Sequence, residues 1–256
     1  MLNLRMCGFA SLALAMLSAA AAAEEAVPVG GALALLDKPK IVRAAVVLIP
    51  GSDGNLKLRP DGSFRRLKRN MLVRTRKTYL RYGIASLTID IGVDPAAAVR
   101  YLRNITPTVV VVGTSRGTLR VPATLSAKPS GIVLTAGFLD SVRSAIGSPA
   151  ALPPTLIVHH RHDHCHVTPP GAVEPFKAWG GAKVRVVWMD GGINAGHSCR
   201  ANAYHGFNGL DGNVVATIAR FVTGLERDQC ASSTGTVIDC RMPRVAPPRM
   251  NSRSRE

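Results

Sequence analysis

Short apolar runs alternate with longer amphipathic segments along most of this chain. The runs are Ala44–Ile49, Ile84–Ile91, Thr108–Val112, Gly131–Thr135, Thr155–Val158 and Lys183–Trp188. Runs without polar alternation predict strands covered on both faces, as in a parallel sheet flanked by helices. The segments between and after them predict helices at Phe64–Arg81, Asp94–Asn104, Ser115–Leu125, around Phe176 and at Asn208–Leu225. This order predicts an α/β fold: a doubly wound, mostly parallel sheet flanked by helices, with no inserted lid domain.

The N-terminal segment has the pattern of a secretory signal peptide. A basic residue precedes the apolar run Met6–Leu17, and small residues at −3 and −1 suit cleavage after Ala23. The run is shorter than the roughly 20 residues of a membrane-spanning helix, so an uncleaved anchor is the less favoured alternative. We expect a signal peptide at residues 1–23, a domain at residues 24–240, a disordered basic tail at residues 241–256, and a periplasmic or extracellular location.

The cysteines indicate disulfides. Cys7 leaves with the signal peptide, and an even number then remains, which in an exported protein favours paired thiols. We favour a Cys230–Cys240 bridge, which closes a short local loop, and a Cys165–Cys199 bridge, which joins two loops. Four free thiols are the alternative. The sequence has no C-x-x-C pair, so neither a redox dithiol nor a zinc ribbon is indicated.

The net charge of +16 is strongly basic, and much of it lies between Lys57 and Arg81. Such a stretch is able to attract nucleic acid, acidic lipid or anionic polymers. Few aromatic residues interleave with it and no nucleic-acid-binding motif accompanies it, so we interpret it as the solvated face of a basic helix. We expect no nucleic-acid partner and no transmembrane segment, and we leave open a contact with an anionic surface or polymer.

The strongest chemical signal is the G-x-S-x-G sequence at residues 113–117 (GTSRG), directly after a predicted strand and before a predicted helix. A nucleophile elbow has this context: a sharp turn raises the serine hydroxyl above the sheet. Glycines flank the serine because a side chain there would collide with the neighbouring strand or helix. A merely structural turn is the alternative. We predict that Ser115 is a nucleophile.

A serine hydroxyl needs a base, and the base needs an acid that orients it. In this architecture they follow in the order Ser, Asp or Glu, His, each after a later strand. Asp163 follows the predicted strand at residues 155–158, and His205 lies between the last strand and the last helix. We predict Asp163 as the acid and His205 as the base. His197 and Asp190, both on the last loop, are the alternatives.

An oxyanion hole draws on two backbone N–H donors. The first belongs to the residue after the nucleophile, here Arg116. The second comes from the loop after an early strand, which here is residues 50–54 (PGSDG). The N–H of Ser52 or Asp53 is suited to donate, and we favour Ser52. An ordinary Ser-Asp-Gly turn is the alternative.

Histidines crowd residues 159–166 (HHRHDHCH). In an extended segment, alternate members would share one face, as in a zinc or copper site: His160, His162, His164 and His166. The same segment supplies Asp163 and is expected to turn after His160, and other clear ligands are lacking nearby. We therefore predict no metal and no other cofactor. A periplasmic metal-binding protein is an alternative function.

These motifs resemble the α/β-hydrolase superfamily over residues 41–225. The likeness is closer to small exported bacterial α/β hydrolases that couple G-T-S-R-G to H-H-x-x-D-x-C and a late C…H-G-F. In this chain the later motifs are residues 159–165 and Cys199 followed by residues 205–207. The early loop departs from the pattern, because Gly51-Ser52 replaces the His-Gly pair of many relatives.

The resemblance implies the α/β-hydrolase fold, a triad of Ser115, Asp163 and His205, and a Cys165–Cys199 bridge beside it. The expected function is a secreted serine hydrolase that cleaves a small ester-like substrate through an acyl-enzyme. Carboxylic esters are favoured over amides, thioesters and lactones. A non-catalytic binding protein on the same scaffold is the alternative. The three residues in the expected order argue against it.

Overall fold

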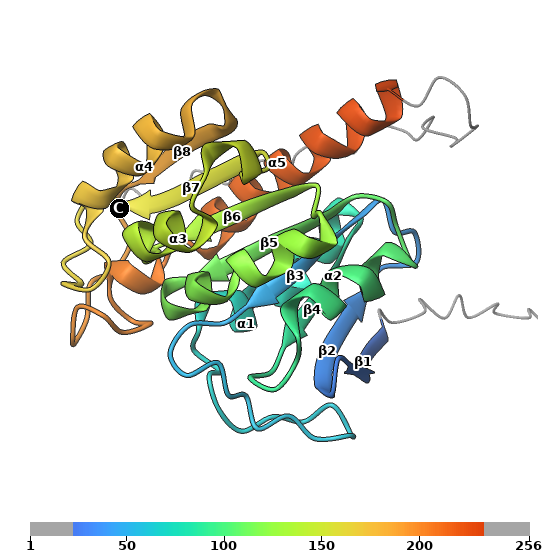
Figure 1. Ribbon diagram of the computed structural model, residues 1–256. Coiled ribbons are helices and arrows are strands. Elements are labelled where there is room, and N and C mark those ends of the chain that lie inside the picture. Colours follow the sequence, from blue (N-terminus) through green and yellow to red (C-terminus); the bar gives the residue numbers. More distant parts are fainter. Residues whose placement is uncertain (1–22, 233–256) are drawn as a thin grey trace, which may run out of the picture.

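The predicted apolar runs form six adjacent strands of one eight-stranded sheet (Figure 1). The computed structural model describes residues 23–232. The strands are β1 (Ala23–Val29), β2 (Ala32–Lys38), β3 (Ala44–Ile49), β4 (Ile84–Ile89), β5 (Val109–Thr114), β6 (Gly131–Thr135), β7 (Thr155–His160) and β8 (Val184–Met189). All six residues of β3 are buried, as are those of β4, β5 and β7, which explains their uninterrupted apolar character.

The strands lie in the order β1-β2-β4-β3-β5-β6-β7-β8. Strands β3 to β8 pair in parallel, whereas β1 and β2 form a hairpin that joins β4 antiparallel. The prediction of a doubly wound, mostly parallel sheet is confirmed. The N-terminal hairpin is an addition that the sequence pattern did not predict.

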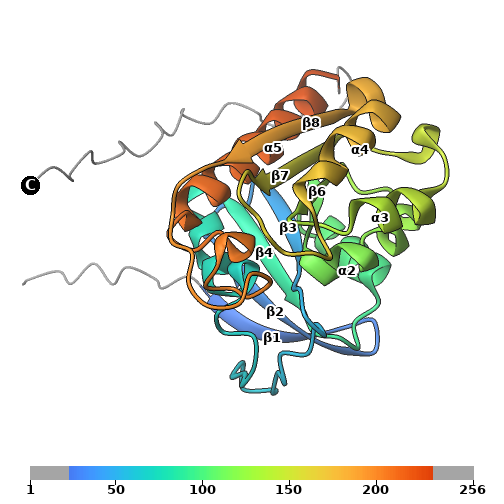
Figure 2. The ribbon, with the colours of Figure 1, turned by 90° about the vertical axis from the view of Figure 1, so that its left-hand side faces the viewer.

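Helices cover both faces of the sheet (Figure 2). The α-helices are α1 (Met71–Thr75), α2 (Pro95–Arg103), α3 (Leu139–Ile146), α4 (Val173–Gly180) and α5 (Asp211–Ser232). The 3₁₀ helices are η1 (Arg76–Tyr82), η2 (Ser115–Arg120), η3 (Pro122–Ala127), η4 (Pro149–Ala151), η5 (Pro170–Ala172), η6 (Gly181–Lys183) and η7 (Tyr204–Gly206). Alternate side chains of β3 serve two cores: Val47 belongs to the core that contains residues of α2, α3 and α4, and Val46 belongs to the core that contains residues of α1 and α5.

The predicted helix at residues 64–81 is wrong in its first part. Residues before Asn70 form a loop in which Leu58 and Phe64 make an isolated bridge and Leu67 has a φ of 60°. Helix α1 starts only after Asn70, whose side chain accepts a hydrogen bond from the Leu72 N–H. Many of the basic residues therefore lie on a long loop, and the interpretation as one basic helix face is wrong for them.

The predicted helix at residues 115–125 is instead two 3₁₀ helices, η2 and η3. The Thr118 hydroxyl donates to the Ser115 carbonyl at 2.6 Å, and Pro122 begins the second helix. The predicted signal peptide, the tail at residues 241–256 and the Cys230–Cys240 bridge lie outside the residues or side chains that the structure describes. Within residues 23–232, no helix is long and apolar enough to cross a membrane.

Candidate active site

The predicted site residues lie at the carboxyl edge of the parallel strands. Ser115 directly follows β5, Asp163 follows β7, and His205 lies in η7 on the segment after β8. Because parallel strands end at the same edge, three residues far apart in sequence are brought to one place. The loop after β3 reaches the same edge and carries Ser52.

Ser115 sits on a strained turn with a φ of 50°. A Cβ on Gly113 would lie 2.8 Å from Val121 Cγ2, and a Cβ on Gly117 would lie 2.2 Å from the Ile49 carbonyl oxygen. These are closer than any real Cβ approaches a neighbour, so both glycines of the motif are required by close packing. A strained non-glycine residue held between two such glycines is typical of a nucleophile elbow.

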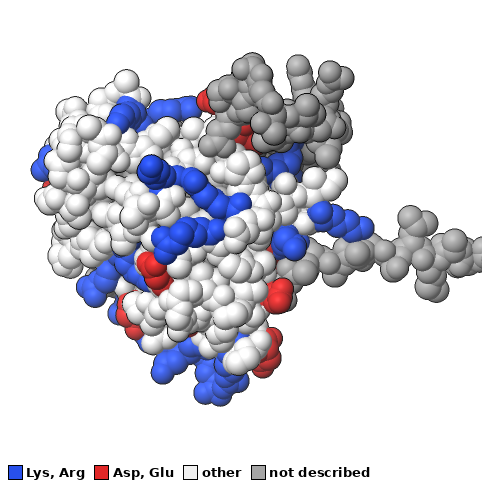
Figure 3. Space-filling view, turned by 45° about the vertical axis from the view of Figure 1, so that its right-hand side comes forward, with Lys and Arg blue, Asp and Glu red and all other residues white. Residues whose placement is uncertain are grey.

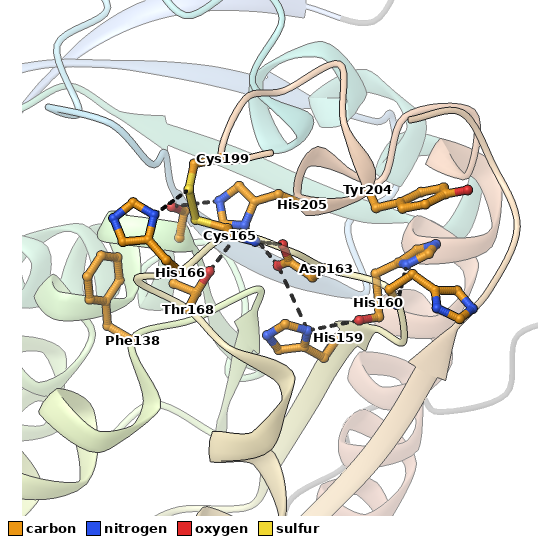
Figure 4. A network of polar contacts seen from close by, with 12 residues as sticks. Phe138, His159, His160, Asp163, Cys165, His166, Thr168, Cys199, Tyr204 and His205 are labelled. Carbon is orange, nitrogen blue, oxygen red and sulfur yellow. Dashed lines mark hydrogen bonds and ion pairs between the residues drawn. A yellow bond between two sulfur atoms is a disulfide. The ribbon is translucent and has the colours of Figure 1, made fainter. Parts of the chain in front are cut away.

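Ser115, His205 and Asp163 form a continuous chain of hydrogen bonds, and Figure 4 labels its members His205 and Asp163. His205 Nε2 lies 2.9 Å from Ser115 Oγ, and His205 Nδ1 lies 2.9 Å from Asp163 Oδ2. The other carboxylate oxygen of Asp163 accepts the Cys165 N–H at 2.9 Å. Since Asp163 accepts a proton at Nδ1, the lone pair of His205 is at Nε2 and faces the serine hydroxyl. Both His205 and Asp163 are buried, which protects this arrangement from water.

Two further buried residues contact this chain, and sequence reasoning assigned neither of them a role in it. The Thr168 hydroxyl oxygen lies 3.2 Å from His205 Nδ1. His159 Nδ1 lies 3.3 Å from the His160 carbonyl oxygen and 4.0 Å from Asp163 Oδ2, so Asp163 is placed between two histidines (Figure 4). Burial lowers the pKa of His159, although the nearby Asp163 carboxylate acts in the opposite direction. Their sequence signal is only proximity to Asp163.

The structure contains the predicted Cys165–Cys199 disulfide. Cys165 is on the loop of Asp163, and Cys199 is on the loop that leads to His205. The bridge therefore fastens the loop of the acid to the loop of the base. The backbone N–H of Cys165 also donates to the Asp163 carboxylate, so the bridged residue contacts the acid directly.

The alternatives His197 and Asp190 take other positions. His197 is exposed, and its Nδ1 accepts the Cys199 N–H at 3.2 Å. Asp190 is also exposed and lies 3.7 Å from His162 Nε2. Neither has a hydrogen bond to Ser115 or His205 among the contacts of the described residues.

The histidine cluster does not share one face. Strand β7 ends at His160, whose ring stacks on Tyr204 with centroids 4.2 Å apart and whose Nε2 lies 2.9 Å from the Gly191 carbonyl oxygen. His162 faces Asp190, and His166 instead lines the cavity at Ser115. Among the residues that the structure describes, no group of three or more His, Cys, Asp or Glu side chains could hold a metal ion.

A cavity of about 890 Å³ opens over Ser115. Its walls come from the loop after β3, the elbow, and the segments that carry His166 and His205. Ser52, with a φ of 60°, and Arg116 both line it. A Cβ on Gly51 would lie 2.9 Å from the Thr114 carbonyl oxygen and 3.0 Å from Ser115 Cβ, so this glycine allows the two loops to pack together. The two expected oxyanion donors therefore flank the serine.

The sequence matches no protein-family model and no curated protein. The structure, by contrast, is similar to solved structures. TT1662 from Thermus thermophilus is 14% identical with a TM-score of 0.58, over 80% of this chain and 98% of that chain. Dienelactone hydrolase from Anabaena variabilis is 19% identical with a TM-score of 0.57, over 79% of this chain and 98% of that chain.

A third similar structure is XC6422 from Xanthomonas campestris, described as an α/β serine hydrolase without a lid. It is 15% identical with a TM-score of 0.51, over 82% of this chain and 94% of that chain. Identities this low establish the fold and not the activity. Residues 23–232 have the α/β-hydrolase fold, with no large lid among them.

Proposed function

We propose that this protein is an exported serine hydrolase that cleaves carboxylic esters through a Ser115–His205–Asp163 triad. The single observation that carries the proposal is the pair of 2.9 Å hydrogen bonds that link the three side chains in the order nucleophile, base, acid. The strained elbow and the cavity above Ser115 support it, because they expose the hydroxyl to a substrate.

The reaction proceeds in two halves. His205 Nε2 removes the Ser115 proton as Oγ attacks the ester carbonyl, and the resulting imidazolium protonates the departing alcohol. Asp163 orients the ring and stabilises its positive charge. Water, deprotonated by His205, then attacks the acyl-enzyme, releasing the carboxylic acid and restoring the serine.

The tetrahedral intermediate carries its negative charge on the former carbonyl oxygen. The backbone N–H groups of Arg116 and Ser52 are the proposed donors to it, and both residues line the cavity beside Ser115. Removal of one donor in such a site typically costs about 3 kcal/mol of barrier height.

Export is supported by the signal-like sequence at residues 1–23 and by the Cys165–Cys199 disulfide, since disulfides persist in oxidising compartments. Esters are supported by the fold, which this chain has in common with the Pyrococcus furiosus esterase PF2001 (12% identical, TM-score 0.56). The absence of a large lid within residues 23–232 favours a small substrate that reaches Ser115 directly.

The test is labelling of the mature protein with a fluorophosphonate probe, which reacts with activated serines. We expect labelling to disappear in Ser115→Ala and His205→Ala, and its rate to fall about 10⁴-fold in Asp163→Asn. His162→Ala is the matched control, because His162 is an exposed histidine on the loop of Asp163, faces Asp190 and lies outside the lining of the cavity, and it keeps the parent rate. Absence of labelling in folded, disulfide-bonded parent protein would overturn the proposed function.

A further inference from the structure

Three arginines line the cavity at Ser115, and each comes from a different segment of the chain. Arg69 lies on the loop before α1, Arg116 follows the nucleophile, and Arg200 lies on the segment that leads to His205. All three residues are exposed. The segments meet around the serine, so the three arginines lie around the cavity that opens over it.

The positive charge of these arginines is not neutralised by the protein. Asp53 is the one carboxylate among the residues that line the cavity, and its Oδ2 lies 2.7 Å from Arg66 Nη1. A hydrogen bond from the Asn55 N–H and the Arg66 guanidinium lower the pKa of Asp53, so it is ionised and already paired. Within the described part of the chain, no carboxylate lies within ion-pair distance of Arg69, Arg116 or Arg200.

Three arginines that lie outside the cavity lining have carboxylate partners. Arg43 pairs with Glu226, Arg74 with Asp211, and Arg76 with Asp37. On the face shown in Figure 3, basic side chains lie in separate groups with acidic ones among them. The cavity at Ser115 is therefore lined by three arginines that have no carboxylate partner among the described residues. A cleft lined by positive charge attracts an incoming anion more strongly than a flat surface does.

We propose that the natural substrate is an ester that carries a second, anionic group, of which a carboxylate is the simplest, and that Arg69, Arg116 and Arg200 bind that group. This inference rests on the proposed function. The planar guanidinium donates two parallel hydrogen bonds to a carboxylate, which gives orientation as well as attraction. The anion is held at the rim while Ser115 attacks the ester carbonyl deeper in the cavity, and the hydrolysis needs no further reactant than water.

The experiment compares two esters that differ at one end only, which is a free carboxylate or its methyl ester: 4-nitrophenyl hydrogen adipate and 4-nitrophenyl methyl adipate. Release of 4-nitrophenol is measured at low salt, with the uncatalysed rate subtracted. We expect kcat/KM to favour the anionic ester at least about 10-fold, mainly through KM, and the preference to shrink as salt is added. The double variant Arg69→Gln/Arg200→Gln should bring the ratio of the two kcat/KM values close to one.

Arg185→Gln is the control variant, because Arg185 is exposed on β8 and lies outside the cavity lining. This substitution removes the same kind of charge as the other two. Its ratio should equal that of the parent. A second readout does not depend on turnover: monomethyl adipate should slow fluorophosphonate labelling of the parent more strongly than dimethyl adipate does.

The possible failures are distinguishable. The anionic-substrate proposal would be overturned by equal kcat/KM values for the two esters in an enzyme whose activity requires Ser115. Equal slowing of labelling by the two adipates would overturn it as well. Either result would leave the proposed hydrolase function standing. Loss of the proposed function itself would appear as a parent protein that neither hydrolyses an ester nor reacts with the probe.

Discussion

Gly117 is the residue at which the elbow has least room. A methyl group there would lie 2.2 Å from the Ile49 carbonyl oxygen and 2.6 Å from that of Pro50, and both are backbone atoms that cannot rotate away. We expect Gly117→Ala to lower the free energy of unfolding by at least about 2 kcal/mol, measured by urea titration, and to abolish fluorophosphonate labelling.

Gly224→Ala in α5 is the matched control for this substitution. Among the described residues, nothing beyond the neighbouring residues and backbone of α5 lies within 4 Å of a Cβ at Gly224, so alanine there should leave stability unchanged or raise it by up to about 1 kcal/mol. A Gly117→Ala protein as stable and as reactive as the parent would show that the elbow is looser than its packing indicates.

The site residues differ in how far the sequence could reveal them. The candidates Ser115, Asp163 and His205 were found because each follows a strand in a known order, and strand ends are visible in the apolar pattern. Thr168 and His159 were missed as members of the site because their contacts with His205 and Asp163 arise only when the loop after β7 folds back. No local rule distinguishes such residues from their neighbours.

The loop between β3 and α1 forms one wall of the cavity, and Asp90 at the end of β4 holds it in place. The Asp90 carboxylate accepts the N–H groups of Leu56 at 2.7 Å and Leu58 at 3.0 Å. Hydrogen bonds to a charged group contribute about 1.5–3 kcal/mol each, so their loss should let this segment open far more often. We expect Asp90→Ala to speed tryptic cleavage of this arginine- and lysine-rich loop at least about 10-fold.

Asp61→Ala provides the comparison for that measurement. Asp61 lies in the same loop, but among the described residues its carboxylate accepts hydrogen bonds only from the nearby Ser63. Its cleavage rate should stay within about twofold of the parent. If the two variants were cut equally fast, Asp90 would not anchor the loop.

The same loop shows where sequence-based prediction of the elements fails. Six strands were predicted closely because their apolar runs are nearly continuous, and β3 to β7 are buried on both faces. The loop, in contrast, was read as helix because Leu67, Met71 and Leu72 have helical spacing. In the structure Leu67 adopts a positive φ, which spacing cannot indicate. The hairpin of β1 and β2 was missed because Glu24, Glu25 and Pro28 give β1 little strand character, and its partner strand supplies the pairing.

At the scale of the whole molecule, a disulfide joins two loops that the parallel sheet alone does not connect. The loop of Asp163 and the segment of His205 follow different strands, and the Cys165–Cys199 disulfide joins them across a sequence separation of 34. A bridge of this span restricts the unfolded chain by about 4 kcal/mol in the loop-entropy description. In the folded protein the bridge also holds the segment of His205 beside the loop of Asp163.

Both effects are measurable in the variant Cys165→Ser/Cys199→Ser. We expect its free energy of unfolding to fall by up to about 4 kcal/mol and its rate of fluorophosphonate labelling to fall with it. Reductant should produce the same losses in a Cys230→Ser/Cys240→Ser control, in which Cys165 and Cys199 are the remaining pair of the mature protein. A thiol titration should first show that Cys165 and Cys199 are reduced in this control. If the reduced control then kept its full labelling rate, the sheet alone would align His205 with Asp163. The opposite result would tie activity to an oxidising compartment, because only there would the two loops remain joined.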